Sequence, residues 1–389
     1  MSRILAVTYG AGHVNMVLPV ISVLKRSGHD VLILALTTAH GPAARAGFTP
    51  LGFRNFLRAS DTLAHEWGPR LSGGTSSNPD VHPDETSAYL GLNYAELIAT
   101  HGQEGAAQAY ADRGRQAFFP IQTVGRIIDD IQPDLVVATS SPRAERAAVT
   151  AAAARGIPAL VLCDFMPQSE LEWLAVPGYG NRLCVMSQGV KHRMVESGRH
   201  VDEIVVTGNP AFDTVFELDA ESLRQDWRNR HGLGPNCRVA LFASQPDREE
   251  NLGALAAVRL AEAGRSKGWL VVYRPHPNEL FDPSILPDWI PVSGGDDSIW
   301  ESLCGCDGCL VISSTVGIQA LLVGRPMAVY DIPVNADPAP YPAMGLGGYG
   351  TTPEAVFDAL EAQSRPDGCG MPRRPAAPAV AAEVERLLT

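Results

Sequence analysis

The chain has 389 residues, more than one hydrophobic core usually supports, so we expect two domains. Its 43 acidic and 31 basic residues give a formal net charge of -12, which disfavours nucleic acid and anionic membrane surfaces as partners. The sequence shows no secretory leader pattern and no apolar run approaching the ~20 residues that span a bilayer. We therefore expect a cytoplasmic protein whose seven cysteines are reduced thiols.

Short apolar runs alternate with helical patterns along both halves of the chain. Each such strand–helix–strand unit predicts a parallel pair of strands with ligand-binding loops at their carboxyl ends. In the first half, strands are expected at 4–9, 30–35, 134–139, 159–163, 182–186 and 203–206, with helices at 17–27 and 144–154. In the second half, strands are expected at 238–244, 269–274, 308–313 and 327–330, with helices at 251–267 and up to Val323.

The pattern predicts an α/β protein with two Rossmann-like, doubly wound parallel-sheet domains that face a central cleft. We place the domain boundary near Asn209-Pro210, where the second series of strands restarts. Two segments do not fit a sheet. The insertion at 53–119 carries a polar, glycine-rich stretch that predicts a mobile loop, and the proline-rich tail ends in a short helix at 379–388.

The first strand ends in Gly10-Ala11-Gly12-His13. Glycines at this point let a ligand approach the backbone, and the start of the following helix offers N–H donors. An imidazole at the end of a strand is well placed to accept a proton from a ligand. The alternative for His13 is a helix-capping or packing role.

Arg274-Pro275-His276-Pro277 follows the strand that begins at Trp269. The two prolines stiffen the backbone, and Arg274 and His276 are both suited to donate hydrogen bonds to a phosphate. The alternative is a plain turn with a solvent-facing histidine.

Ser313-Ser314-Thr315-Val316-Gly317 lies between a buried strand and a helix. Hydroxyls and free N–H groups at a helix start form an anion site, although serine and threonine are also ordinary helix caps. One strand–helix unit separates this segment from the Arg274 turn, which favours phosphate binding by both.

Two further patterns resemble metal ligands. Cys304, Cys306 and Cys309 have metal-like spacing, but no second pair of ligands accompanies them, so we expect buried structural thiols. Gly295-Asp296-Asp297 is expected to be a solvated turn. We therefore expect no metal site, and the absence of a G-x-x-x-x-G-K-[S/T] motif disfavours ATPases of the P-loop class.

At these residues the chain resembles the GT-B glycosyltransferase superfamily. Gly12-His13-Val14-Asn15, with Pro19 a turn later, is similar to the Gly-His-Val-Asn-Pro opening of small-molecule glycosyltransferases, except that Met16 replaces the usual proline. The resemblance implies that His13 is the base that deprotonates the acceptor. Asp164, which follows the Ala159 strand, is a further cleft carboxylate without a secure match to the acid that supports this histidine in the family.

The second half is similar to capsule and Kdo-type transferases and to nucleotide-sugar epimerases. Val206-Thr-Gly-Asn-Pro210 resembles the junction between the two domains, and the Arg274-Pro-His-Pro277 and Ser313-Ser314-Thr315 motifs resemble those that bind the donor's phosphates. At the position of Gln319, many relatives carry a glutamate that holds the donor ribose. A glutamine can still form hydrogen bonds there, but it does not indicate whether the nucleotide is UDP or GDP.

The resemblance implies a metal-independent glycosyltransferase that uses a nucleotide-sugar as co-substrate and needs no other cofactor. Residues 1–209 would bind a soluble small-molecule acceptor, as in specialised metabolism, residues 210–365 would bind the donor, and 366–389 would form a tail. A single base candidate favours inversion of configuration, and both a monomer and a homodimer stay open. The expected donor-phosphate residues are Arg274, His276, Ser313, Ser314, Thr315 and Gly317; those near base and ribose are Ser298, Ile299, Trp300 and Gln319; and those in cleft loops are Gly10, Gly12, Asn15, Asp164, Asn209, Ser244 and Gln245.

Two alternatives share the fold. A UDP-N-acetylglucosamine 2-epimerase is disfavoured because the histidine–arginine–glutamate motif of that family is missing around His276 and the Gly317–Gly324 spacing is short. A non-catalytic sugar-nucleotide-binding protein is disfavoured because His13 is present.

Overall fold

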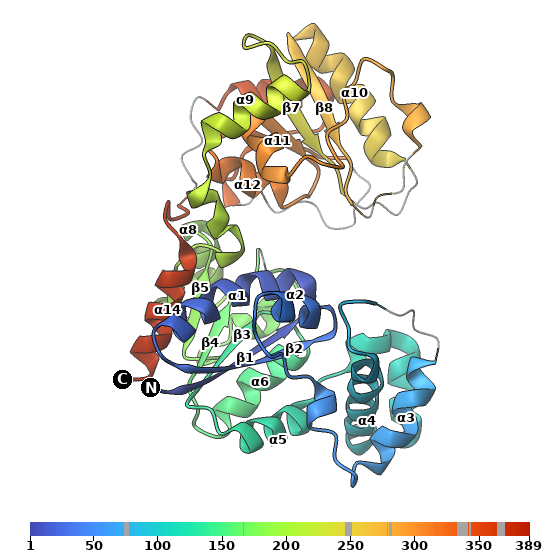
Figure 1. The fold of residues 1–389 in the computed structure, drawn as a ribbon, viewed down its shortest axis with the longest axis vertical. Coiled ribbons are helices and arrows are strands. Elements are labelled where there is room, and N and C mark those ends of the chain that lie inside the picture. Colours follow the sequence, from blue (N-terminus) through green and yellow to red (C-terminus); the bar gives the residue numbers. More distant parts are fainter. Residues whose placement is uncertain are drawn as a thin grey trace. The chain divides into compact units, whose positions relative to one another are not determined.

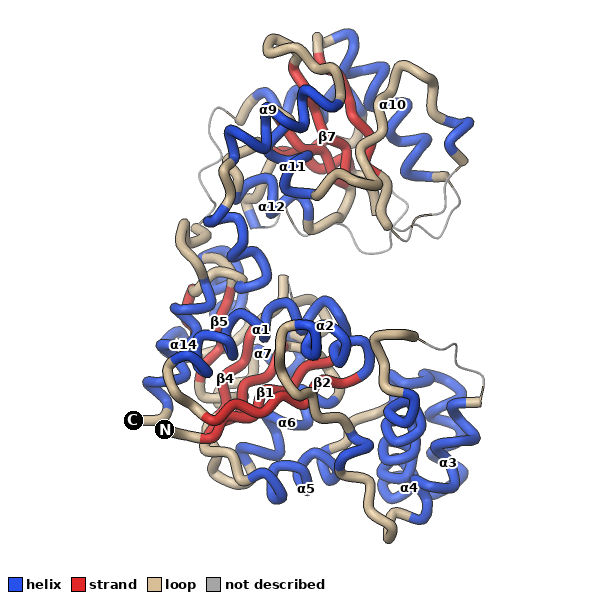
Figure 2. Tube along the Cα trace, in the orientation of Figure 1, coloured by secondary structure: helices blue, strands red, loops and turns tan. Residues whose placement is uncertain are grey.

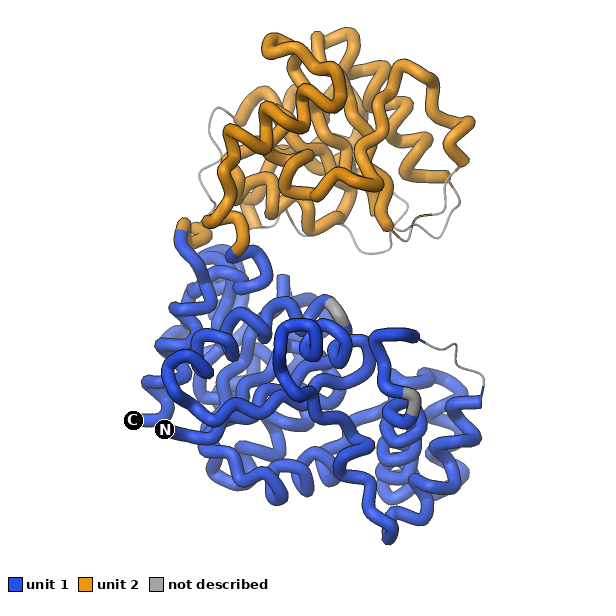
Figure 3. The backbone as a smooth tube through the Cα atoms, in the orientation of Figure 1, with its two compact units in different colours: residues 1–213, 374–389 blue, residues 214–373 orange. Residues whose placement is uncertain are grey.

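The computed structural model describes residues 1–73, 78–165, 167–245, 251–277, 279, 282–332, 341, 344–363 and 370–389. The chain forms two compact units (Figure 3). Unit 1 comprises Met1–Asp213 with Arg374–Thr389, and unit 2 comprises Thr214–Arg373. Each unit contains one parallel sheet with helices on both faces, so the predicted α/β class with two doubly wound sheets is confirmed.

The sheet of unit 1 has the strand order β2-β1-β3-β4-β5-β6, and every neighbouring pair is parallel. Strand β1 lies between β2 and β3, so the chain adds β2 on one side of β1 and then β3 on the other. The carboxyl ends of β1 and β3 therefore lie next to each other, and ligands bind at such a reversal of strand order in folds of this kind. The strands are β1 (Arg3–Tyr9), β2 (Asp30–Leu36), β3 (Leu135–Thr139), β4 (Ala159–Leu162), β5 (Arg182–Val185) and β6 (Ile204–Val206).

Helices cover both faces of this sheet (Figure 1): α1 (Gly10–Arg26) and α2 (His40–Arg45) lie on one, and α5 (Ile121–Ile131) and α6 (Ala144–Ala153) on the other. Helix α1 begins seven residues before the predicted start at Val17. The cause is Gly10, whose φ of 80° lets the chain turn from β1 directly into the helix. The unit also contains the helices α7 (Leu171–Leu174) and α8 (Gln188–Glu196).

The insertion at 53–119 is mainly helical. Its two main helices, α3 (Thr62–Ser72) and α4 (Pro83–Arg113), pack side by side (Figure 2), and α4 is kinked at Gly102. The described part of the insertion adds no strand to the sheet, as expected, but its helices were not predicted; residues 74–77 of the expected mobile loop lie outside the described residues. Within the insertion, the buried carboxylate of Glu85 on α4 accepts hydrogen bonds from the amides of Phe53 and Arg54 at 2.9 and 3.1 Å, which ties α4 to the start of the insertion.

The sheet of unit 2 has the order β11-β10-β9-β7-β8 and is also parallel. The strands are β7 (Arg238–Ala243), β8 (Trp269–Arg274), β9 (Gly308–Val311), β10 (Met327–Tyr330) and β11 (Gly348–Gly350). The helices are α9 (Ala220–Arg230), α10 (Leu252–Ser266), α11 (Ile299–Gly305), α12 (Val316–Leu322) and α13 (Pro353–Glu361).

The apolar core of unit 2 lies mainly between the sheet and the helices α10 and α13, and α9, α11 and α12 cover the opposite face. Strand β11 and helices α9, α11 and α13 were not predicted.

The last helix, α14 (Ala376–Leu387), returns to unit 1 and packs against α1. It begins three residues before the predicted start at Ala379. Asp213 caps it from a distant part of the sequence, because its carboxylate accepts the amides of Ala376 and Ala377 at 2.6 and 2.7 Å. Within the described part of the chain, none of the helices has the length and apolar character needed to cross a bilayer.

Candidate functional site

His13 lies in the first turn of α1, at the carboxyl end of β1. The residue is half-buried, and its Nδ1 is fully covered. Gly12, one residue earlier, is exposed, and a Cβ placed there would meet no atom within 4 Å. Asn15 is also exposed on this end of the helix. The backbone beside His13 is therefore open to a ligand, as the two glycines predicted.

A buried carboxylate lies on the helix that follows the neighbouring strand. Glu145 lies in the first turn of α6, which follows β3, and its exposure is 0%. Burial raises the pKa of Glu145, while the charges of His13 and Arg143 and hydrogen bonding to the backbone of Glu145 and Tyr9 act against this shift. Because β1 and β3 are adjacent, the sheet brings the two helix starts together and makes His13 and Glu145 electrostatic neighbours.

Several buried polar atoms at this end of the sheet have no hydrogen-bond partner among the described residues. They are Thr8 Oγ1, His13 Nδ1 and Glu145 Oε2. Buried polar groups are nearly always hydrogen-bonded in folded proteins, so an orphaned group of them marks a place where a ligand or water completes the bonding.

Aromatic and cationic side chains surround the pair. The Arg143 guanidinium stacks 4.3 Å from the centre of the Tyr9 ring, and this ring lies 5.8 Å from that of Tyr89 on α4. Burial raises the pKa of Tyr89, and the charge on Tyr9 acts in the same direction. Tyr89 thus brings the helical insertion into contact with the carboxyl end of β1.

Glu145 was missed by the sequence analysis, which considered Asp164 instead. Asp164 follows β4, one strand further from β1, and is exposed, with its amide donating to Ser140 Oγ at 3.1 Å. The sequence carried one usable signal: Glu145 is the second residue of a predicted helix that follows a predicted strand. What the sequence did not show was that this strand is the neighbour of β1.

In unit 2, the ends of β7 and β9 are joined by side chains predicted to lie in loops. Gln245 Oε1 accepts the amide of Ser313 at 3.0 Å and also its hydroxyl. Ser244, the preceding residue, donates through Oγ to Glu279 at 3.0 Å. The serine motif and the loop after β7 therefore form one hydrogen-bonded edge.

Arg274 is bound within the protein. Its guanidinium donates to Ser293 Oγ at 3.2 Å, to Ser302 Oγ at 3.0 Å and to the Asp297 carbonyl at 3.0 Å. Burial lowers the pKa of Arg274, and the charges of Asp297 and Glu301 oppose this effect. The structure thus gives Arg274 a role in fixing the turn before α11, and leaves its predicted phosphate contact a prediction.

The rest of the serine motif divides between exposed and packed residues. Thr315 is exposed, while Ser314 is half-buried, with its hydroxyl accepting the Val316 amide at 3.4 Å and its carbonyl accepting the Tyr341 hydroxyl. Gly317 is buried, and a Cβ there would overlap Met327, so this glycine serves the packing of α12 on the sheet. Gln319 is half-buried on the same helix.

The residues predicted near the donor base begin α11. Ser298 caps this helix: its hydroxyl accepts the Glu301 amide at 3.1 Å, and Glu301 accepts the Ser298 amide at 2.7 Å. Ile299 and Trp300 are partly exposed in the first turn. At the end of unit 1, Asn209 is buried and accepts the Ala211 amide at 2.9 Å, which stabilises the turn there.

The prediction of a solvated turn at Gly295–Asp297 was wrong for Asp297. Its side chain is only 8% exposed and binds His231 Nε2 at 2.8 Å and Arg230 at 3.1 Å. Burial opposes its ionisation, but the hydrogen bonds from His231 and Ser293 outweigh this effect and lower the pKa of Asp297.

Cys304, Cys306 and Cys309 are buried, and burial raises the pKa of each thiol. Across the described ranges, no three histidine, cysteine or acidic side chains are grouped as metal ligands.

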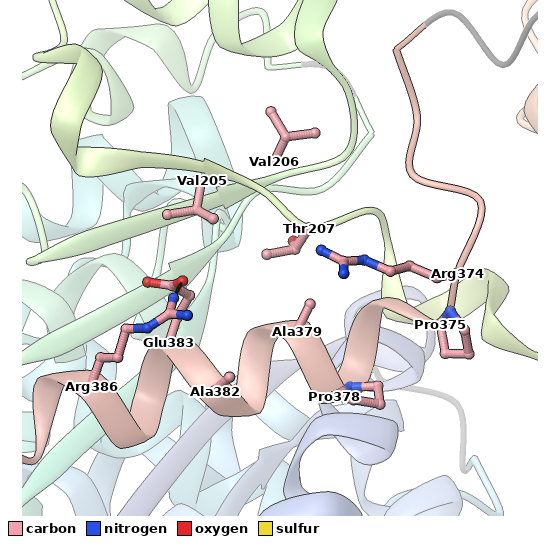
Figure 4. A pocket seen from close by; sticks show the side chains of 10 residues that line it. All are labelled: Val205, Val206, Thr207, Arg374, Pro375, Pro378, Ala379, Ala382, Glu383 and Arg386. Carbon is pink, nitrogen blue, oxygen red and sulfur yellow. Dashed lines mark hydrogen bonds and ion pairs between the residues drawn. The ribbon is translucent and has the colours of Figure 1, made fainter.

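A cavity of about 500 Å³ lies elsewhere in unit 1, between the edge strand β6 and α14 (Figure 4). Glu383, which lines the cavity, forms an ion pair with Arg386, which also lines it. Glu383 forms a second ion pair, at 3.4 Å, with Arg182, which is not part of the lining. We assign no substrate to this cavity. The residues in the figure are Val205, Val206, Thr207, Arg374, Pro375, Pro378, Ala379, Ala382, Glu383 and Arg386.

No protein-family model matches the sequence, and no curated protein matches it. Solved structures do match over the whole chain. The calicheamicin glycosyltransferase CalG4 is 17% identical, with 100% of this chain and 98% of that chain covered and a TM-score of 0.59. The glycosyltransferase SnogD from Streptomyces nogalater is 15% identical, with 100% of both chains covered and a TM-score of 0.56.

UDP-GlcNAc 2-epimerase from Neisseria meningitidis, solved with UDP-GlcNAc bound, is 13% identical, with 99% of both chains covered and a TM-score of 0.56. At these identities the likeness concerns the fold. Glycosyltransferases and epimerases of this kind share the GT-B architecture, and the chain described here has the GT-B fold.

Proposed function

We propose that the protein is a glycosyltransferase that moves a sugar from a nucleotide-sugar to a soluble small-molecule acceptor. The observation that carries the proposal is that His13 and the buried Glu145 lie at the carboxyl ends of adjacent strands, where the charge of His13 acts on the pKa of Glu145. A carboxylate held in a protein interior next to an imidazole is the arrangement by which enzymes orient a histidine and stabilise it once it has taken a proton.

In this proposal the acceptor hydroxyl lies against His13, which removes its proton as the hydroxyl oxygen attacks the anomeric carbon. Glu145 stabilises the imidazolium that forms. Gly12 gives the acceptor room, because a Cβ placed there would meet no atom within 4 Å. A single base that deprotonates an incoming hydroxyl favours inversion at the anomeric carbon.

The donor's phosphates are proposed to bind in unit 2 at His276 and the Ser313–Thr315 motif. Hydrogen-bond donors there would neutralise the charge that grows on the departing diphosphate, which is the role that a metal ion has in other transferases. We therefore propose that the transfer needs no metal and no cofactor besides the nucleotide-sugar. UDP and GDP are the nucleotides to test first.

The second candidate is nucleotide-sugar epimerisation, which the likeness to UDP-GlcNAc 2-epimerases supports at the level of the fold. We place transfer first because the histidine–arginine–glutamate motif of the epimerases is missing around His276.

A binding experiment tests the donor half of the proposal. Purified protein would be melted with UDP, GDP, TDP, ADP and CMP, together with His276→Ala and Ser314→Ala. A nucleotide present at 100 Kd should add about 2.7 kcal/mol of stability, and this gain should be lost in both variants. Failure of every nucleotide to raise Tm would contradict the proposed donor site.

A further inference from the structure

Two side-chain hydroxyls and one backbone amide donate hydrogen bonds to a residue that the sequence motifs did not include. Glu279 lies three residues after His276, in the turn that follows β8. Its Oε1 accepts the Tyr273 hydroxyl at 2.6 Å and the Ser244 hydroxyl at 3.0 Å. Its Oε2 accepts the amide of His276 at 2.9 Å. One carboxylate thus connects the ends of β7 and β8 with the histidine turn.

Helix α10 packs closely against this carboxylate. Gly253, in the first turn of α10, lies beside it, and a Cβ there would overlap both Ser244 Oγ and Glu279 Oε1. Only a glycine therefore fits at this position without displacing the hydrogen-bonded pair.

The same network reaches the serine motif. Ser244 is followed by Gln245, whose Oε1 accepts both the amide and the hydroxyl of Ser313. His276 and Ser313 are thus linked by hydrogen bonds to Glu279 on one side and Gln245 on the other, with the Ser244–Gln245 backbone between them.

Resting on the proposed function, we infer that Glu279 is a positioning residue for diphosphate binding. It acts through His276 and Ser313, and its carboxylate holds the amide of His276 so that the imidazole has one fixed orientation. A charged acceptor suits this task, since hydrogen bonds to a carboxylate are stronger than those to a neutral group.

Glu279→Gln tests the inference at constant side-chain volume. A glutamine retains one carbonyl oxygen for Tyr273 and Ser244 but turns an NH₂ group towards the His276 amide, so the contact becomes donor against donor. We expect Kd for UDP, measured by titration calorimetry, to rise on the order of 10-fold, as for loss of a hydrogen bond to a charged group. Kinetically, KM for the donor should rise and KM for the acceptor should not change.

Gly253→Ala disturbs the same carboxylate from α10 without changing any donor or acceptor, and it should weaken UDP binding in the same way. Glu262→Gln is the matched control, because Glu262 is exposed on the same helix. Its Kd for UDP should equal that of the wild-type protein. Circular dichroism and Tm would establish that each variant is folded.

The ring signals of His276 in a spectrum of histidine-labelled protein give a readout that needs no nucleotide. They should shift in Glu279→Gln and stay in place in Glu262→Gln. Unshifted His276 signals, or wild-type UDP binding by a folded Glu279→Gln, would overturn the inference. If the wild-type protein binds none of UDP, GDP, TDP and ADP while the His276 signals shift, the proposed function fails and the positioning role of Glu279 towards His276 stands.

Discussion

Glu85 should make the stability of unit 1 depend on pH. Its carboxylate is fully buried in the first turn of α4 and accepts two backbone amides, those of Phe53 and Arg54. Burial raises the pKa of Glu85 from 4.5 to about 7, although these amides and the charge of Arg54 act in the opposite direction. In the folded protein the side chain therefore keeps its proton over a range in which the unfolded chain has lost it.

The direction follows from linkage. Well below pH 4.5, Glu85 is protonated in both the folded and the unfolded protein, so it does not reduce the free energy of unfolding. As pH rises from 4.5 towards 7 the unfolded chain loses this proton first, so the free energy of unfolding falls, and it levels off above pH 7. Each pKa unit corresponds to 1.36 kcal/mol, so the total loss is about 3 kcal/mol. Between pH 5 and pH 8 the expected loss is about 2 kcal/mol.

Urea unfolding of the wild-type protein and of Glu85→Gln, each at pH 5 and pH 8, measures this term. The other titrating groups are common to both proteins and cancel in the difference. The wild-type protein should lose about 2 kcal/mol more than the variant between the two pH values. Parallel pH profiles for the two proteins would refute the reasoning.

Three further changes have distinct expected outcomes. Glu145→Gln should lower kcat on the order of 10²-fold and leave Kd for the nucleotide unchanged, which steady-state kinetics and calorimetry would check. Asp213→Ala removes the cap of α14 and should cost about 1 kcal/mol of stability in thermal unfolding; an unchanged Tm would show that the cap contributes nothing. Gly12→Ala should leave Tm unchanged, because its Cβ meets no atom within 4 Å, yet slow transfer by occupying the space beside His13; wild-type rates would place the acceptor elsewhere.

The two parallel sheets could be predicted because buried parallel strands are continuous apolar runs, which stand out from the helical patterns between them. Residues 4–9 and 269–274 were located almost to the residue, as β1 and β8. The helical insertion was not predicted, since α3 and α4 have internal proline and glycine residues, among them Pro69 and Gly102, that disfavour a helix from sequence alone.

The site was predictable as far as it depends on a single strand end. His13 and the Ser313 motif each follow a strand in the sequence, and the structure places them there. Glu145 and Glu279 depend on contacts between strands or turns that are distant or irregular in sequence. The pairing of β1 with β3 gives Glu145 its place beside His13, and this pairing is a property of the sheet order.

Glycosyl transfer itself is tested most directly by following the nucleotide-sugar that binds the protein, with and without small phenolic and alcoholic acceptors. We expect release of the nucleoside diphosphate that depends on an acceptor, persists with EDTA and is lost in His13→Ala. Acceptor-independent inversion at C2 of the donor sugar, seen by NMR, would contradict transfer and establish an epimerase.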